Sequence, residues 1–67
     1  MNFIEITRKV QGTSKKIYRV NAERGKDIYA FLGPGDYYRL GSVMDDRTGG
    51  WNPSVNDILA EDWEVFE

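Results

Sequence analysis

The sequence predicts an α+β fold, in which a small antiparallel sheet carries an N-terminal helix packed on it and a short helical turn before the last strand. Apolar residues recur with helical spacing near the N-terminus, and several short apolar or mixed runs follow. The intervals between these runs are too short for the crossovers that join parallel strands, so the strands are expected to pair antiparallel. A chain of 67 residues has room for one core. We therefore expect a single domain over residues 1–67.

A helix is predicted over residues 3–11. Asn2, followed by Glu5 three positions later, has the form of a capping box, in which each side chain accepts a hydrogen bond from the other residue's backbone. Gly12 ends the run. The apolar face of this helix comprises Phe3, Ile6 and Val10.

Three strands are predicted in the middle of the chain. From Lys15 to Val20, apolar and basic residues mix, which is typical of a strand packed mainly on one face. A polar connection over 21–26 follows. The nearly continuous apolar run 28–32 predicts a central strand buried on both faces, and 33–36 is a turn. Residues 37–44 form the third predicted strand.

The C-terminal third is predicted to contain a turn, a helical turn and a last strand. Residues 45–50 consist of Asp, Arg, Thr and Gly and are expected to form a turn. Ser54 with Asp57 three positions later predicts a second helix start, completed by residues 58–60. The final strand spans 63–66, where Trp63 is expected to be a core aromatic.

Composition excludes several classes of chemistry. The chain has no Cys and no His, which removes disulfides, thiolate zinc sites, cysteine nucleophiles and the usual general base near pH 7. We expect no enzyme activity, no catalytic residue, no cofactor and no metal. The net charge is −2, whereas affinity for duplex nucleic acid needs an excess of Lys and Arg, so we expect no nucleic-acid partner. No membrane span or signal pattern is present, so we expect a cytoplasmic protein.

Charge divides unevenly between the two halves of the chain. Residues 1–26 carry seven Lys and Arg against two acids, and residues 27–67 carry two Arg against nine acids, which gives +5 and −7. Two interpretations are open. The basic half forms a surface for an anion, or the halves complement each other between neighbouring elements or subunits.

The C-terminal sequence carries a resemblance. Residues 51–65, WNPSVNDILAEDWEV, are similar to the W-x-P-S-x-x-D-[LI]-L-A-x-D-W-x-V pattern that closes the chain in the Thoeris anti-defence sponge family of small phage and prophage proteins. The basic segment 15–19 resembles that family's K-K-V-x-R strand. The resemblance implies a homo-oligomer, a tetramer built from dimers, in the host cytoplasm. It also implies that the chain sequesters a cyclic nucleotide immune signal of the cyclic ADP-ribose type without cleaving it.

The expected ligand site is centred on the loop that precedes the second helix. Pro53 makes this loop rigid, and a helix start offers backbone N–H groups. An aromatic ring can stack on a base, carboxylates and amides can bind hydroxyls, and an Arg can match a phosphate. The candidate ligand-binding residues are Trp51, Asn52, Ser54, Asp57, Arg19 and Asp62.

Structural interpretations of the same residues remain open. Trp51 is equally well explained as a core aromatic. Ser54 and Asp57 are explained as a helix cap and its acidic partner, and Asp62 as an acceptor for nearby backbone N–H groups. Two alternative functions also remain: a sponge for cyclic oligonucleotide signals, and a small protein-binding module that occludes a host protein.

Overall fold

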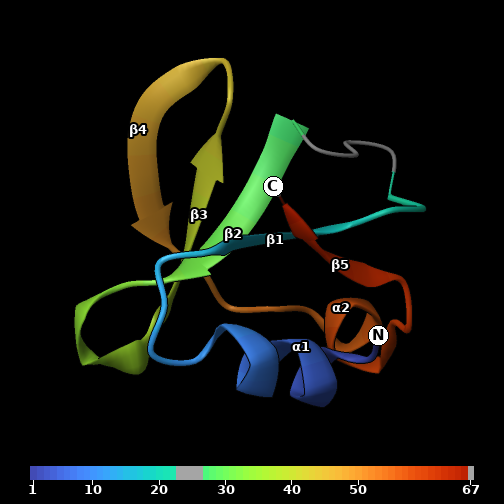
Figure 1. Ribbon diagram of the computed structural model, residues 1–67. Helices are drawn as coiled ribbons and strands as arrows, with labels where there is room; N and C mark the ends of the chain where they lie inside the picture. Colours follow the sequence, from blue (N-terminus) through green and yellow to red (C-terminus); the bar gives the residue numbers. More distant parts are fainter. Residues whose placement is uncertain (23–26, 67) are drawn as a thin grey trace.

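The computed structural model describes residues 1–22 and 27–66, which fold as a five-stranded antiparallel sheet with two helices (Figure 1). The strand order is β4-β3-β2-β1-β5. In chain order the elements are α1 (Phe3–Val10), β1 (Lys16–Arg19), β2 (Ile28–Leu32), the 3-10 turn η2 (Pro34–Asp36), β3 (Tyr38–Ser42), β4 (Asp45–Gly50), α2 (Val55–Leu59) and β5 (Trp63–Phe66). The predicted α+β fold class is confirmed, with α1 contacting β5 and α2 preceding the last strand.

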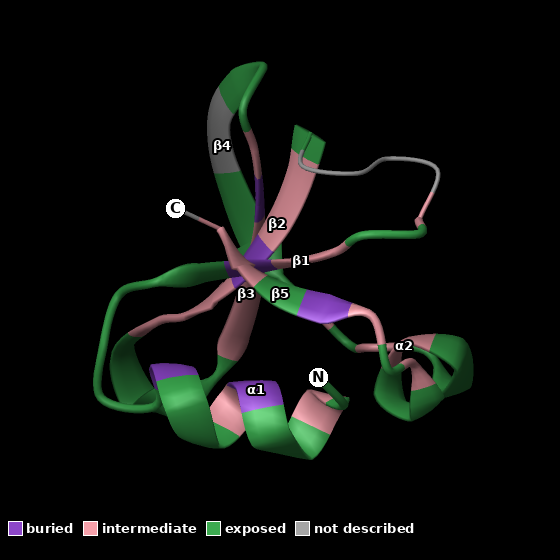
Figure 2. Ribbon diagram, turned by 45° about the vertical axis from the view of Figure 1, so that its right-hand side comes forward, coloured by how far each residue is buried: buried purple, intermediate pink, exposed green. Residues whose placement is uncertain are grey.

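Helix α1 forms for the reasons that its sequence predicts. The Asn2 side chain accepts the backbone N–H of Glu5 at 2.8 Å, and Glu5 accepts the backbone N–H of Asn2 at 3.2 Å, so the capping box is complete. The helix ends at Val10, one residue earlier than predicted, and Gly12 adopts a φ of +78° that favours glycine. Figure 2 shows the buried positions of α1 turned toward the sheet.

The core lies between α1 and one face of the sheet. Side chains alternate between the two faces of a strand, so every second residue of β1, β2 and β5 meets the helix layer. The five buried residues of this core are Ile6, Val10, Ile17, Ala30 and Trp63. Trp63 therefore has the core position predicted for it.

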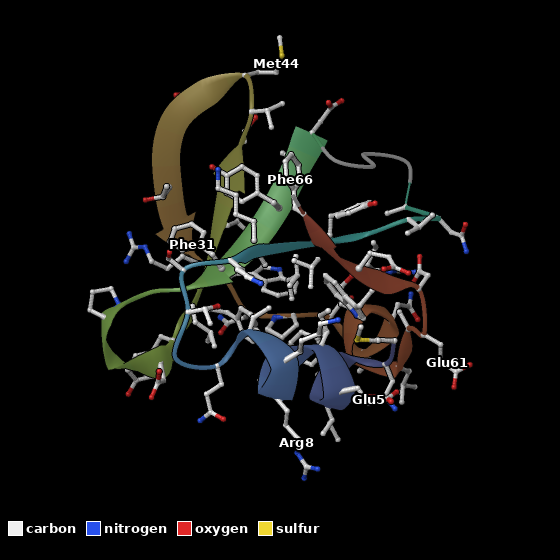
Figure 3. The ribbon with its side chains drawn as sticks, in the orientation of Figure 1. Glu5, Arg8, Phe31, Met44, Glu61 and Phe66 are labelled. Carbon is white, nitrogen blue, oxygen red and sulfur yellow. The ribbon has the colours of Figure 1, made fainter. Side chains whose placement is uncertain are left out.

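The opposite face of the sheet is aromatic and has no helix over it in the described part of the chain. Tyr29 packs against Phe31 and Phe66 with ring centroids 6.1 and 5.8 Å apart, and Tyr18 packs against Phe66 at 5.8 Å. The Lys16 ammonium lies 4.4 Å from the centroid of the Tyr29 ring. Figure 3 shows Phe66 on the side of the sheet away from α1.

This open face corrects one prediction. The run Ile28–Leu32 does form a central strand, but only Ala30 is buried and its neighbours are half-buried. The reason is that the described chain places a helix layer on one face of the sheet only. The residues of β2 that point to the other face are therefore not covered by a helix. A strand that is apolar on both faces is typical of a sheet covered on both sides. Here the described residues cover only one side.

A second correction concerns residues 45–50, which form strand β4 and not a turn. The hairpin turn falls at Val43 and Met44, because Ser42 already pairs with Asp45. β4 is an edge strand that pairs only with β3, with a register shift at Gly41 and Ser42. β4 pairs with β3 through its backbone, and the Arg39 guanidinium of β3 also donates to the Thr48 hydroxyl at 3.4 Å. Backbone pairing does not depend on the type of side chain, so β4 tolerates a composition typical of turns. Of the connection predicted over 21–26, residues 23–26 lie outside the described residues.

The sheet divides between β1 and β2. The β1–β2 ladder comprises only two pairs, Lys16 with Phe31 and Ile17 with Ala30. On either side, β1 pairs with β5 over four residues and β2 with β3 over five. Beyond Ile17 the two strands therefore diverge, and the gap between them opens on the side where Trp51 and α2 lie. No helix in the described part of the chain is long and apolar enough to cross a membrane.

Candidate functional site

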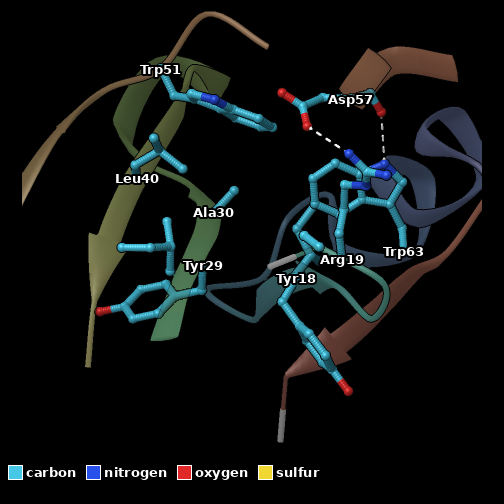
Figure 4. A pocket seen from close by; sticks show the side chains of 11 residues that line it. Tyr18, Arg19, Tyr29, Ala30, Leu40, Trp51, Asp57 and Trp63 are labelled. Carbon is cyan, nitrogen blue, oxygen red and sulfur yellow. Dashed lines mark hydrogen bonds and ion pairs between the residues drawn. The ribbon is translucent and has the colours of Figure 1, made fainter. Parts of the chain in front are cut away.

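A cavity of about 100 Å³ lies where β1 and β2 diverge (Figure 4). Its walls come from both strands, from β3, from the loop before α2, and from α2 and β5. The lining residues are Ile17, Tyr18, Arg19, Ala22, Ile28, Tyr29, Ala30, Leu40, Trp51, Asp57 and Trp63. Figure 4 shows the rings of Tyr18 and Tyr29 directed away from the cavity, toward the aromatic face of the sheet.

Arg19, the last residue of β1, holds two carboxylates. Its Nε donates to Asp62 Oδ1 at 3.0 Å, and its Nη1 donates to Asp57 Oδ1 at 3.2 Å. About a quarter of the Arg19 side chain is exposed (26%). The hydrogen bond to Asp62 is the main cause of a raised pKa for Arg19, burial opposes it, and the hydrogen bond to Asp57 adds to it. Arg19 thus remains a cation and ties β1 to α2 and to the segment before β5.

Asp57 is fixed from two sides. As the third residue of α2 it completes a capping box: its Oδ2 accepts the Ser54 backbone N–H at 3.1 Å and the Ser54 hydroxyl at 2.9 Å. Its Oδ1 accepts from Arg19, and Asp57 is one of the residues that line the cavity. Partial burial would raise the pKa of Asp57, but the hydrogen bonds from Ser54 and Arg19 outweigh it and hold that pKa below its ordinary value.

Asp62 accepts a hydrogen bond from Arg19 but does not line the cavity. Its Oδ2 accepts the backbone N–H of Asn21 at 2.8 Å while Oδ1 accepts from Arg19. Burial opposes ionisation of Asp62, and the bonds from Asn21 and Arg19 overcome this, so its pKa also lies below its ordinary value. The acceptor role for nearby backbone N–H groups, one of the two interpretations of this residue, is present in the structure.

Trp51 belongs to both the core and the cavity. It is half-buried and packs against Phe3, Tyr38 and Trp63 with ring centroids 6.0, 5.7 and 5.9 Å apart. Its backbone N–H donates to the Tyr38 carbonyl at 3.2 Å, which continues the sheet by one residue beyond β4. Part of the ring borders the cavity opposite Asp57, as Figure 4 shows.

The six residues predicted from sequence fall into three groups by their place relative to the cavity. Arg19, Trp51 and Asp57 line the cavity together, and Asp62 and Ser54 contact Arg19 and Asp57 from outside it. Asn52 lies exposed on the loop and is not part of the cavity wall. The apolar wall formed by Ile28, Ala30 and Leu40 was not predicted, because apolar strand residues carry no signal that separates a cavity wall from a packed core.

The cavity combines an aromatic ring, one carboxylate and one cation on a rigid frame. Such a set can stack on a planar group and form hydrogen bonds to hydroxyl or amide groups. Trp63 adds rigidity, because its indole N–H donates to the Asp57 carbonyl at 2.9 Å and so fixes α2 against the core. Among the described residues there is no group of three or more acidic side chains that could hold a metal ion.

Comparison with known proteins identifies the family. The family model of the Thoeris anti-defense 2-like domain, Tad2-like, matches residues 1–66. No curated protein matches the chain.

Proposed function

The chain belongs to the Thoeris anti-defense 2-like family, and we propose that it binds a nucleotide immune signal of the cyclic ADP-ribose type and holds it without cleaving it. Membership of the family implies an anti-defence sponge function and nucleotide signal binding. We also propose the identity of the ligand, the number of subunits and the residues of the site. The proposed site comprises Arg19, Trp51 and Asp57 in the cavity, with Asn52, Ser54 and Asp62 around it.

The observation that carries the proposal is the cavity beside Trp51. A nucleotide offers a base, ribose hydroxyls and phosphates. An indole ring is a stacking surface for a base, and a carboxylate accepts hydrogen bonds from ribose hydroxyls. Trp51 and Asp57 present both groups to the same cavity from elements that the core holds in place.

Binding without turnover fits the titration behaviour of these groups. General acid–base catalysis is most effective when a group exchanges its proton near the working pH. The pKa of Asp57 is lowered and the pKa of Arg19 is raised, so neither exchanges a proton near pH 7. The two groups are therefore suited to fixed electrostatic contacts.

The small cavity supports a homo-oligomer, which we propose to be a tetramer built from dimers. Pockets that enclose whole small molecules measure about 300–1,000 Å³, several times the cavity of about 100 Å³ in one chain. Exposed aliphatic residues on the two helices provide a surface for a second copy. These exposed helix residues are Ile4, Val55, Ile58 and Leu59. The host cytoplasm is the proposed location.

Thermal denaturation with a nucleotide panel tests the proposal. A ligand at 100 times its Kd stabilises the folded protein by about 2.7 kcal/mol, which for a domain of this size raises Tm by about 10 °C or more. We expect this shift with cyclic ADP-ribose-type nucleotides and a much smaller one for Trp51→Ala. A protein that melts at the same temperature with every nucleotide, cyclic oligonucleotides included, would instead fit a protein-binding module.

A further inference from the structure

We infer that the cavity binds the ribose and base of the nucleotide signal and leaves the phosphates outside, with Asp57 accepting a ribose hydroxyl and Arg19 acting as a positioning residue. This inference rests on the proposed function and specifies which part of the ligand enters. It differs from the role that the sequence predicts for Arg19, namely a fork for a phosphate. Three features of the structure favour it.

The first feature is the local charge. Arg19 is the only cation among the described residues that line the cavity, and Asp57 and Asp62 both bond to it. One guanidinium against two carboxylates leaves this cluster with a net charge of −1. The raised pKa of Arg19 and the lowered pKa values of both acids keep all three ionised near pH 7. A phosphate beside Arg19 would be repelled by the two carboxylates, whereas a neutral sugar would not be repelled.

The second feature is the remaining hydrogen-bonding capacity of Asp57. A carboxylate has about four acceptor positions. The Asp57 carboxylate accepts three bonds in this structure, two from Ser54 on Oδ2 and one from Arg19 on Oδ1. About one acceptor position of the carboxylate remains, and Asp57 is one of the residues that line the cavity. A hydroxyl donor fits this position, and a phosphate, which offers acceptors at neutral pH, does not.

The third feature is the shape of the cavity. Its wall is apolar along Ile28, Ala30 and Leu40, and the Trp51 ring lies across from Asp57 (Figure 4). At about 100 Å³ it is smaller than the roughly 300–1,000 Å³ of pockets that enclose whole small molecules, so it has room for one part of a nucleotide and not for all of it. The charged part of the ligand then projects toward solvent or toward a second copy.

Arg19 acts in this scheme through Asp57. Its Nη1 fixes Asp57 Oδ1, and its Nε is in turn fixed by Asp62. Removing Arg19 should therefore weaken every ligand that uses Asp57, with or without phosphate. A direct phosphate contact would weaken only the ligands that carry phosphate. The ratio of these two effects separates a positioning role from a direct phosphate contact. A general loss of folded structure would also weaken both kinds of ligand, so each variant must be shown to be folded.

The test is isothermal titration calorimetry with cyclic ADP-ribose, adenosine and pyrophosphate as probes. The proteins are the wild type, Asp57→Asn, Arg19→Gln and the control Asp36→Asn, which makes the same charge change at an exposed residue of η2 outside the cavity. Asp36 has a φ of +60°, a conformation that Asn tolerates. Melting curves of each variant establish that it is folded at the temperature used.

We expect adenosine to displace cyclic ADP-ribose and pyrophosphate not to. Asp57→Asn should weaken both nucleoside-bearing probes at least tenfold, Arg19→Gln should weaken them by the same factor, and Asp36→Asn should change neither. The inference is overturned if pyrophosphate competes, if Arg19→Gln spares adenosine, or if Asp57→Asn leaves binding unchanged or tightens it. A wild-type protein that binds neither cyclic ADP-ribose nor adenosine contradicts the proposed function itself, which is a different result.

Discussion

Asp57 serves the fold and the cavity with one carboxylate. Its Oδ2 caps α2 through Ser54, and its Oδ1 joins Arg19 at the cavity wall. The capping role was predictable, because Ser54 and Asp57 are three residues apart in sequence. The bond to Arg19 was not, because Arg19, Asp57 and Asp62 come from β1, from α2 and from the segment before β5, and only the sheet register brings them together.

The lowered pKa values of Asp57 and Asp62 predict how stability depends on pH. A group whose pKa is lowered by folding stabilises the protein above its unfolded pKa, and that contribution is lost as pH falls through the folded value. The ordinary value is 3.8 for both residues. We therefore expect the free energy of unfolding to fall as pH drops below about 4, measured by urea denaturation at each pH. The double variant Asp57→Asn, Asp62→Asn should be less stable at pH 7 and show a shallower acid slope; an unchanged slope would contradict the shifts.

Gly41 provides a prediction on the aromatic face. A Cβ at this position of β3 would lie 2.6 Å from the Tyr29 ring, which has packed onto the glycine. We expect Gly41→Ala to reduce stability by about 1–3 kcal/mol, because the ring must leave its contacts with Phe31 and Phe66. Gly49→Ala is the matched control, since no atom lies within 4 Å of its Cβ. Equal melting temperatures for the two variants would show that the Tyr29 ring is not seated as described.

At the level of elements, the helices were predictable and one strand was not. α1 and α2 both begin with a capping box that can be read from residues three positions apart, and both occur where predicted. β4 has no such local signal. Its Asp and Gly residues are typical of a turn, and they form a strand only because β3 offers a free edge with which to pair. The partner of β4 is the preceding strand β3, and the composition of residues 45–50 carries no sign of that pairing, so composition alone gave the wrong result for these residues.

The attachment of α1 to the sheet predicts a contrast between two isoleucines of one helix. Ile6 is fully buried in the core, whereas 64% of Ile4 is exposed. Ile6→Val should cost about 0.5–1.5 kcal/mol and Ile6→Ala about 2–5 kcal/mol, because each leaves a cavity in the core. Ile4→Ala removes the same atoms from the surface and should change stability by less than about 0.5 kcal/mol. Urea denaturation measures all three, and equal costs for Ile4→Ala and Ile6→Ala would contradict this placement of α1.

At the scale of the whole molecule, the described chain forms one helix layer on one sheet. The core is small, and apolar side chains remain exposed on α1, on α2 and at the β3–β4 turn. The alternation of polar and apolar residues expected for a sheet with one solvated face is absent from β2, where Tyr29 and Phe31 point away from the core. These features favour association of several copies, and the tetramer remains a prediction.

Self-association through the helices is tested by light scattering coupled to size-exclusion chromatography. We expect an oligomer at micromolar concentration, and we expect Val55→Glu with Leu59→Glu to dissociate it, because both side chains are about 70% exposed and a carboxylate is costly to bury. The control pair is Val43→Glu with Met44→Glu at the β3–β4 turn, which are also exposed. Figure 3 shows Met44 at the tip of this hairpin, away from both helices. A monomeric wild type, or dissociation by the control pair alone, would contradict this surface.

The central claim is that the chain binds a nucleotide signal and releases it unchanged. The most direct measurement is mass spectrometry of the small molecules that heat releases from protein previously incubated with a lysate of signal-producing cells and freed of unbound material. We expect recovery of an intact cyclic ADP-ribose-type nucleotide from the wild type, and its loss from Asp57→Asn but not from Asp36→Asn. Recovery of a hydrolysed product, or of no nucleotide from folded wild-type protein, would contradict it.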